Sequence, residues 1–446
     1  MIRDLLCGPL GAMALLLSGV FLTVRLRFVQ IKQLPRALKN AAACDRDDCA
    51  CGAISPMQSV CTALAGTMGT GNIAGVAGAI ALGGPGAVFY MWLAAFFGMA
   101  TKYLEAALAV RFRRRNAHGE WIGGPMYVME AGLGSKARPL AVLFCLCGVL
   151  TSFGMGNAVQ VNTLAGSLCT LAEVLGWRCG EKTLRLATGL LLTILTALTV
   201  LGGMRRIACA AERLLPFVST VYVLCMLLVI IVHAGRVSAA FEQIFLSAFS
   251  PRAVLGGGVG ITLRKAISTG VTRGVFTNEA GMGSSAIAHA AAHGATPQRQ
   301  GLWGIFEVFV DTFLICTLTA LGILVSGCEI PYGCAAGAEV TTQAVATLFG
   351  ARMSAVMITL CMACFAVSTL MAWSFYGMRC VEYVTGGRGV KGYLMLFALL
   401  ITPFALLPSA QMWEMAEVFT VLMALCNLPA LLLLSGGEMK MEKKGG

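Results

Sequence analysis

The stretch Ala63–Val76 reads ALAGTMGTGNIAGV and lies at the centre of a long apolar segment, Met57–Leu82. Two glycines and an asparagine interrupt this segment, at Gly69, Gly71 and Asn72. Backbone polar groups in a bilayer need partners, so a helix breaks at mid-membrane only where protein or a polar cavity satisfies them. Close helix packing is the alternative role for such glycines. The asparagine beside them favours a binding site, and we predict a broken membrane helix here.

The composition is that of a membrane protein. Of the 446 residues 58% are hydrophobic and only 12% are charged, whereas soluble proteins carry about 25% charged residues. The net charge of +12 would suggest nucleic acid in a soluble protein. Here the basic residues cluster at the ends of apolar segments, which is typical of topology anchors. We therefore expect a multi-pass protein of the plasma (inner) membrane whose surroundings are lipid, with no nucleic-acid partner.

Apolar runs of about 20 residues predict membrane-spanning helices, and the sequence contains eleven candidates. One extra N-terminal helix precedes ten core helices. The expected spans are Pro9–Leu26, Met57–Leu82, Ala87–Val110, Leu140–Leu171, Leu184–Leu201, Ile207–His233, Leu255–Phe276, Leu302–Val325, Ser354–Tyr376, Tyr393–Leu406 and Ala416–Leu434.

Lysine and arginine alternate strongly between the two sets of loops. Cytoplasmic loops carry the excess of these residues, which predicts an external N-terminus and a cytoplasmic C-terminus. The set of loops that is rich in lysine and arginine, which we expect to be cytoplasmic, includes Arg25, Arg27, Lys32, Arg36, Arg111, Arg113, Arg114, Arg115, Arg205, Arg206, Arg264, Lys265, Arg273, Arg299, Arg388, Lys391 and Lys443.

A second glycine-rich stretch, Leu255–Gly260, begins five core helices after the first break. Matching breaks in two halves indicate an inverted-repeat transporter with its site at the repeat interface. We predict one transmembrane domain with repeats at 57–233 and 251–434, the extra helix at 9–26 and a cytoplasmic tail at 435–446. A break near Ser268–Gly270 is the alternative. We favour Gly256–Gly260 because it leaves Arg264 and Lys265 toward the cytoplasm.

Half-helix ends supply the chemistry of such a site. Their N-termini present N–H groups that suit a carboxylate, and their C-termini present carbonyls that suit Na⁺. Gln160 on the third core helix, and Ser368, Thr369 and Trp373 on the eighth, are polar or aromatic residues at corresponding places in the two halves. Hydroxyls are suitable ligands for a hard cation, and Trp373 could wall off a small side chain. Back-bonding of the hydroxyls and simple packing are the alternatives.

Other chemistry-bearing residues point less directly to a site. Glu307 and Asp311 lie four residues apart in the seventh core helix, and could bind a cation, carry a proton, or pair with Arg273 or Arg299; we favour the ion pairs. No histidine, including His289 and His293, has an evident catalytic or metal partner. Cys328 and Cys334 share an outer loop and could form a disulfide. The loop cysteines have no role that we can read, although a metal site is possible: Cys44, Cys49 and Cys51.

Several long motifs resemble the alanine or glycine:cation symporter family (sodium:alanine symporters). They are ALAGTMGTGNIAGV with the following ALGGPGAVFYMWLAAFFGMATKYLE, GGPMYVMEAGLG at Gly123–Gly134, GVTRGVFTNEAGMGSSAIAHAAA from Gly270, and FVDTFLICTLTAL from Phe309. The resemblance covers nearly the whole chain. It implies an all-α, leucine-transporter-like fold with a 5+5 inverted repeat and two broken helices. It also implies Na⁺-driven uptake of alanine, glycine or related small neutral amino acids.

The resemblance also implies site residues, which we name by their numbers here. The substrate pocket falls on Thr70, Gly71, Asn72, Gln160, Leu255, Gly256, Gly257, Thr369 and Trp373. One sodium site falls on the carbonyls of Ala65 and Met68 with the hydroxyls of Ser368 and Thr369, and a weaker second cation site on Thr67 and Asn72. No cofactor is expected beyond the sodium ion. Proton coupling through Glu307 or Asp311 is the nearest rival; a channel or a membrane enzyme fits less well, since no nucleophile–base pair or metal cluster is evident.

Overall fold

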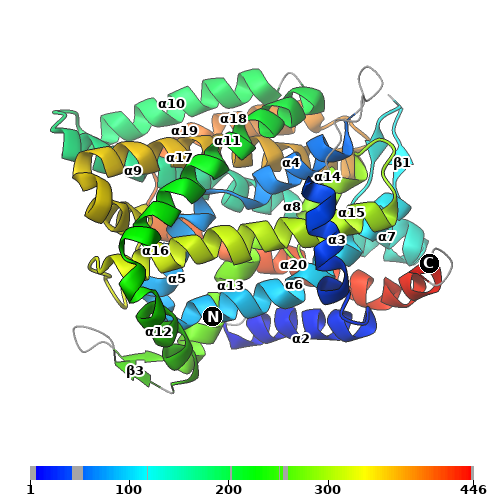
Figure 1. The fold of residues 1–446 in the computed structure, drawn as a ribbon. Coiled ribbons are helices and arrows are strands. Elements are labelled where there is room, and N and C mark those ends of the chain that lie inside the picture. The colour runs from blue at the N-terminus through cyan, green and yellow to red at the C-terminus, as the bar shows by residue number, and fades with distance from the viewer. Residues whose placement is uncertain are drawn as a thin grey trace.

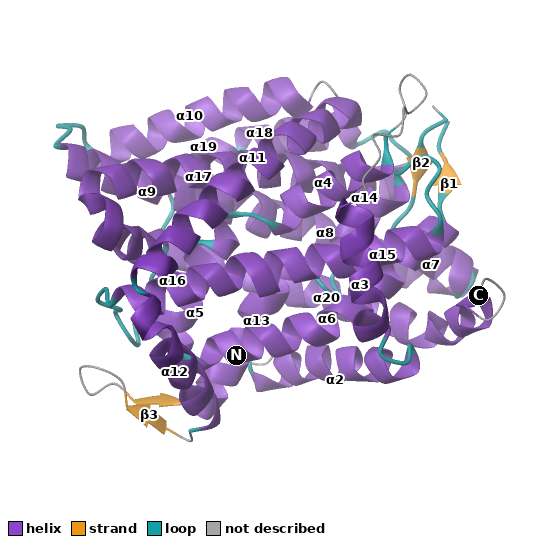
Figure 2. Cartoon of the chain, viewed as in Figure 1, coloured by secondary structure: helices purple, strands orange, loops and turns teal. Residues whose placement is uncertain are grey.

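The computed structural model describes residues 7–42, 54–117, 119–200, 203–250, 252–254 and 260–442. Within these ranges the chain is almost entirely helical (Figure 2). Cys44, Cys49, Cys51, Leu255, Gly256 and Gly257 lie outside the described residues. Cys328 and Cys334 are both free thiols, so the disulfide considered for them does not form here.

The first half of the chain places a broken helix between long continuous ones. Its elements are α2 (Pro9–Arg25), α3 (Val29–Ala42), α4 (Pro56–Thr67), the 3₁₀ turn η1 (Thr70–Asn72), α5 (Ala74–Gly83), α6 (Gly86–Arg111), β1 (Arg114–Arg115), β2 (Trp121–Ile122), α7 (Pro125–Gly132), η2 (Ser135–Ala137), α8 (Arg138–Phe153), the π-helical η3 (Gly154–Val159), α9 (Gln160–Leu175), α10 (Glu181–Val200) and α11 (Gly203–Val232).

The second half of the chain also contains a broken helix among continuous ones. Its elements are η4 (Ala234–Arg236), α12 (Val237–Phe249), β3 (Arg252–Val254), β4 (Gly260–Thr262), α13 (Leu263–Asn278), α14 (Ser284–Ala290), α15 (Pro297–Val308), the π-helical η6 (Phe309–Cys316), α16 (Thr317–Ser326), α17 (Ala338–Thr385), α18 (Val390–Leu399), α19 (Ile401–Leu406) and α20 (Ser409–Glu442). The strands pair only as short antiparallel hairpins, β1 with β2 and β3 with β4.

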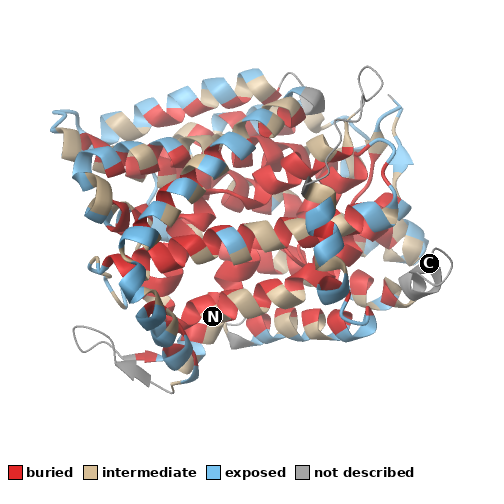
Figure 3. Cartoon of the chain, in the orientation of Figure 1, coloured by how far each residue is buried: buried red, intermediate tan, exposed pale blue. Residues whose placement is uncertain are grey.

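Seven described helices are long and apolar enough to cross a membrane, or eight if the bent pair α2–α3 is one span. The broken pairs α4–α5 and α13–α14 and the short α18–α19 lie among them (Figure 1). Burial is greatest in α6, where 83% of the apolar window is buried, and least in α10, where 28% is buried. Buried residues fill the middle of the bundle and exposed ones its outer helices (Figure 3). Exposed leucines on α10, such as Leu191 and Leu198, are expected to face lipid.

The expected spans coincide with observed helices except at the sixth core helix. There the chain forms the β3–β4 hairpin, and α13 then runs unbroken through Ser268–Gly270 to Asn278. Its break lies at 279–283, before α14 begins. The break predicted at Gly256–Gly260 falls on a stretch of which residues 255–259 lie outside the described part of the chain, and the alternative at Ser268–Gly270 is wrong.

The two ends of the bundle carry different sets of basic residues. Figure 1 shows β3, α12 and the N-terminus at one end of the bundle, and β1, α7 and the C-terminus at the other. Because α13 begins directly after β4, Arg264 and Lys265 lie at the end of the N-terminus, opposite Arg111 and its neighbours. The prediction that they share one side of the membrane with Arg111 and its neighbours is therefore wrong. Arg273 of the expected cytoplasmic set also lies toward the end of the N-terminus, because it lines the same cavity as Lys265, so the orientation predicted from the other basic loops stands as a proposal.

Candidate functional site

The first broken helix is held open by its own asparagine. α4 ends at Thr67, and the chain passes through the short turn η1 before α5 starts at Ala74. Asn72 Oδ1 accepts a hydrogen bond of 3.1 Å from the backbone N–H of Gly69, which satisfies a donor that the break frees. Residues 70–72 are fully buried. The helix break predicted from Gly69, Gly71 and Asn72 is confirmed, because the helix is interrupted between α4 and α5.

Gln160 connects the third core helix to this break. It is the first residue of α9, directly after the π-helical segment η3. Its Oε1 accepts hydrogen bonds from the Thr70 backbone N–H (3.0 Å) and from Thr70 Oγ1 (2.9 Å). A Cβ on Gly69 would lie 2.8 Å from Thr369 Oγ1 and 3.1 Å from Gln160 Oε1. The absence of a side chain at Gly69 therefore lets α9 and α17 approach the broken backbone.

α17 brings the predicted cation ligands to the end of α4. Thr369 Oγ1 donates a hydrogen bond of 2.9 Å to the carbonyl of Ala65. Ser368 Oγ instead donates to its own helix, at the carbonyl of Phe365 (2.9 Å). Donating one proton leaves the lone pairs of each hydroxyl free to meet a cation. Ala65, Met68, Ser368 and Thr369 are all buried, so an ion among them would be shielded from water.

Trp373 lies one turn beyond Thr369 and is fully buried. A Cβ on Gly156 of η3 would lie only 2.2 Å from Trp373 Cβ, so the indole packs directly on the backbone of the third core helix. The indole Nε1 donates a hydrogen bond of 3.0 Å to Glu279 Oε1, in the break between α13 and α14. Trp373 thus contacts both the third core helix and the second broken helix.

Asp311 is part of this centre, contrary to the ion pairs expected for it. Asn72 Nδ2 donates to Asp311 Oδ1 at 2.6 Å, and Thr312 Oγ1 donates to Oδ2 at 2.9 Å. Asp311 lies in the π-helical segment η6, and such segments are frequent at functional sites. A fully buried carboxylate therefore adjoins the weaker predicted cation site at Asn72. Thr67 of that site bonds back to α4, through the carbonyl of Leu64 at 3.2 Å.

The second break presents side chains that the sequence did not single out. Glu279 adopts a left-handed conformation with φ 54°, which non-glycine residues rarely adopt. Ser284 Oγ donates to the Glu279 carboxylate, and the backbone N–H of Ala280 donates to Asn278 Oδ1 at 3.0 Å. Asn278 Nδ2 in turn donates to Thr312 Oγ1 at 3.2 Å. The break thus joins α13 to the seventh core helix through side chains.

Glu307 has partners other than the arginines expected for it. Its Oε1 lies 3.3 Å from Lys102 Nζ, and its Oε2 lies 3.0 Å from His289 Nε2. Gln300 Nε2 contacts the other imidazole nitrogen at 3.0 Å. These side chains are fully buried. His289 therefore has a structural partner that sequence reasoning missed, because the two residues lie on different helices.

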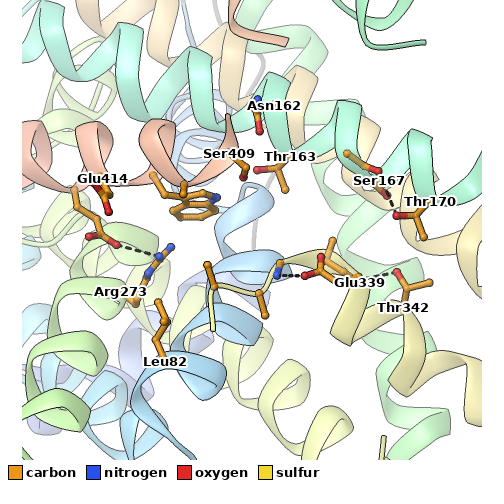
Figure 4. A pocket seen from close by; sticks show the side chains of 18 of the residues that line it. Leu82, Asn162, Thr163, Ser167, Thr170, Arg273, Glu339, Thr342, Ser409 and Glu414 are labelled. Atoms are coloured by element: carbon orange, nitrogen blue, oxygen red, sulfur yellow. Dashed lines mark hydrogen bonds and ion pairs between the residues drawn. The ribbon is translucent and has the colours of Figure 1, made fainter. Parts of the chain in front are cut away.

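A cavity of about 550 Å³ lies near the N-terminal end of the bundle. Figure 4 shows its wall, with Asn162 and Thr163 of α9 facing Arg273 of α13 and Glu339 of α17. None of the predicted pocket residues on η1, α9 or α17 is among its lining residues, so the cavity is separate from the buried centre, and we call it the vestibule. Among the described residues, no group of three or more His, Cys, Asp or Glu side chains could hold a metal ion.

Aromatic and charged side chains stand between the vestibule and the buried centre. Arg273 forms an ion pair of 3.0 Å with Glu417 and stacks on Trp413, with its guanidinium 4.1 Å from the ring centroid. The Trp413 ring lies 5.0 Å from that of Phe276. A Cβ on Gly71 would lie 3.3 Å from the Phe276 ring. This stack therefore links the vestibule to the first broken helix.

Comparisons with known proteins agree with this geometry. Residues 1–444 match the sodium:alanine symporter family. The chain belongs to the sodium:alanine symporter family. It is 41% identical to the sodium/alanine symporter AgcS of Methanococcus maripaludis, over 98% of this chain and 94% of the relative. It is 42% identical to an uncharacterized transporter of Haemophilus influenzae, over 93% of this chain and 88% of the relative.

The fold agrees as well. The structure of MhsT in complex with L-phenylalanine superposes with a TM-score of 0.61 at 12% identity, covering 87% of this chain and 98% of that one. The predicted family and the all-α, leucine-transporter-like fold are confirmed. The chain is a multi-pass membrane protein and a sodium-coupled amino-acid symporter. The count of eleven spans and the inverted repeat stay predictions.

Proposed function

We propose that this symporter carries a small neutral amino acid such as alanine or glycine into the cell together with Na⁺, by alternating access. The observation that carries the proposal is the meeting of Thr70, Gln160 and Thr369 at the first broken helix, with Trp373 one turn farther along α17 against the third core helix and the second break. The close packing of Trp373 on Gly156 leaves little volume there, which favours a small side chain. The freed N–H groups of η1 suit the substrate carboxylate.

The proposed sodium site uses the carbonyls of Ala65 and Met68 with the hydroxyls of Ser368 and Thr369. Its support is the 2.9 Å contact between Thr369 Oγ1 and the Ala65 carbonyl, which brings two of the proposed ligands together. The weaker second site at Thr67 and Asn72 gains a candidate carboxylate ligand in Asp311, 2.6 Å from Asn72 Nδ2. Oxygen ligands of these types suit a hard cation.

The vestibule suits entry from outside. Its cavity contains both charge signs, with Arg273 and Lys265 opposing Glu339 and Glu414, as a zwitterion requires. The stack of Arg273, Trp413 and Phe276 would then close over a bound substrate. In this assignment the vestibule is external, which agrees with the proposed external N-terminus.

Uptake of labelled alanine and glycine by proteoliposomes tests the proposal. We expect accumulation when Na⁺ is higher outside and none without a sodium gradient. An inhibition series with serine, leucine and phenylalanine should show falling competition as the side chain grows. Equal uptake driven by a pH gradient alone, with no sodium present, would contradict sodium coupling and favour the proton-coupled alternative.

A further inference from the structure

Five buried titratable side chains from four segments form a cluster in which the carboxyl groups outnumber the basic groups. Its members are Lys102 and Glu105 of α6, Glu279 of the second break, His289 of α14 and Glu307 of α15. Each is at most 2% exposed. Lys102 Nζ also donates to Ser285 Oγ at 2.7 Å, directly after the Ser284 that donates to Glu279. The cluster is therefore continuous with the second break.

The hydrogen bonds of His289 indicate a neutral imidazole. The single hydroxyl proton of Ser59 is donated to the Ala288 carbonyl at 2.8 Å. Ser59 Oγ must therefore be the acceptor in its 3.3 Å hydrogen bond with Gln300 Nε2. That assignment makes Gln300 Nε2 a donor to His289 Nδ1 as well. His289 Nδ1 is then an acceptor and its Nε2–H donates to Glu307, which is the neutral tautomer.

The charges of the cluster do not balance with every carboxyl ionised. Three carboxylates then face the single ammonium of Lys102, which leaves two negative charges in excess. An uncompensated buried charge is costly, and a carboxylate in such a place takes up a proton instead. The other titratable groups nearby are Asp311 of η6 and Tyr376 of α17, and neither can supply a positive charge. The helices α20 and α4 contact the cluster through the uncharged side chains of Asn427 and Ser59.

The partners identify which carboxyl holds the proton. Glu307 is matched by Lys102 and by His289 Nε2–H, and Glu279 accepts from Trp373 and Ser284. Glu105 Oε1 accepts from the neutral amide of Asn427 at 2.7 Å, and the backbone N–H of Gly283, which is also uncharged, donates to the same carboxyl. Glu105 Oε2 is buried and makes no hydrogen bond within the described part of the chain. Ionisation is therefore least stabilised at Glu105.

The same amide links Glu105 to the segment that breaks the sixth core helix. Asn427 Nδ2 donates to Glu105 Oε1 and also to the carbonyl of Gly281, at 2.9 Å. A movement of this segment would change the environment of Glu105 directly. We propose that Glu105 is a proton-binding site, distinct from the proposed sodium ligands, which holds a proton in this conformation and exchanges it with the cytoplasm when the segment between α13 and α14 moves. The transport part of this inference rests on the proposed function.

Infrared spectroscopy of the full-length protein in lipid tests the proton without any transport assay. A protonated buried carboxyl gives a carboxylic-acid C=O stretching band that a carboxylate lacks. We expect this band in the wild type at neutral pH and the loss of its Glu105 component in Glu105→Gln, whose amide oxygen can still accept from Asn427. Glu105→Asp should shift the band instead of removing it. The matched control is Glu130→Gln, in the exposed ion pair with Arg114, which should leave the band unchanged. An unaltered band in Glu105→Gln would overturn the assignment.

Transport then tests the exchange. Sodium-driven alanine uptake should vary with the pH on the cytoplasmic side in the wild type, and Glu105→Gln should flatten that profile. If the pH profile of uptake by Glu105→Gln matches that of the wild type, the proposed proton exchange is wrong, and the proton on Glu105 is a fixed part of the structure. A wild-type protein without sodium-driven uptake would contradict the proposed function, and the infrared band would still decide the proton.

Discussion

Gln160 Oε1 accepts two hydrogen bonds from Thr70, one from the backbone N–H and one from the hydroxyl. This relationship ties the third core helix to the centre of the first broken helix. The other end of the same amide is also fixed, because Gln160 Nε2 donates to the Met155 carbonyl at 3.0 Å. Gln160 therefore holds the geometry of η1 besides any contact with substrate.

Replacing Gln160 with leucine should weaken alanine binding by about tenfold or more. The change leaves the buried N–H of Thr70 without its acceptor, and an unsatisfied buried group costs about 1–3 kcal/mol, where about 1.4 kcal/mol is tenfold in affinity. Binding to purified protein, measured by calorimetry at saturating sodium, checks this. Gln160→Glu keeps the acceptor and serves as the control for a lost amide donor. Equal alanine affinity in Gln160→Leu and the wild type would contradict the role.

Trp373 should set the volume of the proposed pocket. Trp373→Ala should admit larger neutral side chains and weaken alanine binding, because the indole fills the space against Gly156. Such a truncation in a packed core costs about 3–5 kcal/mol of stability, so Trp373→Phe is the milder companion variant. Competition of labelled alanine by leucine and phenylalanine measures the change. An unchanged substrate profile in both folded variants would place the pocket elsewhere.

The sequence predicted the spans well because each depends on a local property. Apolar runs of sufficient length identified helices such as α6 and α10 within a few residues. The first break was equally predictable, since Gly69, Gly71 and Asn72 interrupt an apolar helix at its centre. Its partner residues Gln160 and Thr369 were inferred from their polarity and from the family resemblance, and the structure brings Gln160 to η1 and Thr369 to the end of α4.

The second break was missed because its signal is not a glycine run. Gly281 and Gly283 both have positive φ, of 91° and 76°, and they lie in the stretch Asn278–Gly283, which has two polar residues at its start. Reading glycine spacing together with Glu279 in an apolar setting could have found it. The partners of Glu307 and Asp311 depend on which helices pack together, and no pattern along the chain contains that information.

The Arg273–Glu417 ion pair should slow exchange between the vestibule and the buried centre. Glu417→Gln removes the charge partner of Arg273 while keeping a similar volume, so the stack on Trp413 should loosen. We expect bound alanine to dissociate several-fold faster, measured by isotope washout at fixed sodium. Glu414→Gln, which lines the same cavity, is the matched control and should dissociate as the wild type does.

Glu130 of α7 should make stability depend on pH at the end of the bundle that holds the C-terminus. Burial alone would raise its pKa, but hydrogen bonds from Arg114 (2.6 Å) and Tyr383 (3.1 Å) outweigh it and hold the pKa below its usual value. A carboxyl with a lowered pKa adds stability above its ordinary pKa of about 4.3 and loses it as pH falls through the folded value.

Glu130→Gln should therefore unfold at a slightly lower temperature than the wild type at neutral pH, and the difference should disappear in acid. The shift should be small because the pair is partly exposed. Thermal unfolding across a pH series checks it, with Glu181→Gln in the exposed pair with Arg185 as the control. A difference that persists unchanged into acid would mean that the carboxylate charge is not involved.

Ser368 and Thr369 should determine the sodium requirement more than the shape of the pocket. A shell of two hydroxyls with the Ala65 and Met68 carbonyls supplies the several oxygens that a hard cation needs. Water can replace one lost ligand, so single changes should be mild, whereas Ser368→Ala with Thr369→Val leaves the shell short. Each tenfold loss of ion affinity corresponds to about 1.4 kcal/mol, and we expect half-saturating sodium to rise by at least that factor.

The measurement is the sodium dependence of alanine uptake at fixed alanine, with protein insertion verified. Ser368→Ala alone is the cleaner variant, because Ser368 Oγ bonds within its own helix whereas Thr369 Oγ1 also contacts the broken helix at Ala65. Thr359→Val, on the same helix but bonded to Ser167, is the matched control and should keep the wild-type sodium dependence. An unchanged sodium requirement in the inserted double variant would show that the coupling ion binds elsewhere, and Asp311 beside Asn72 would then be the next residue to test.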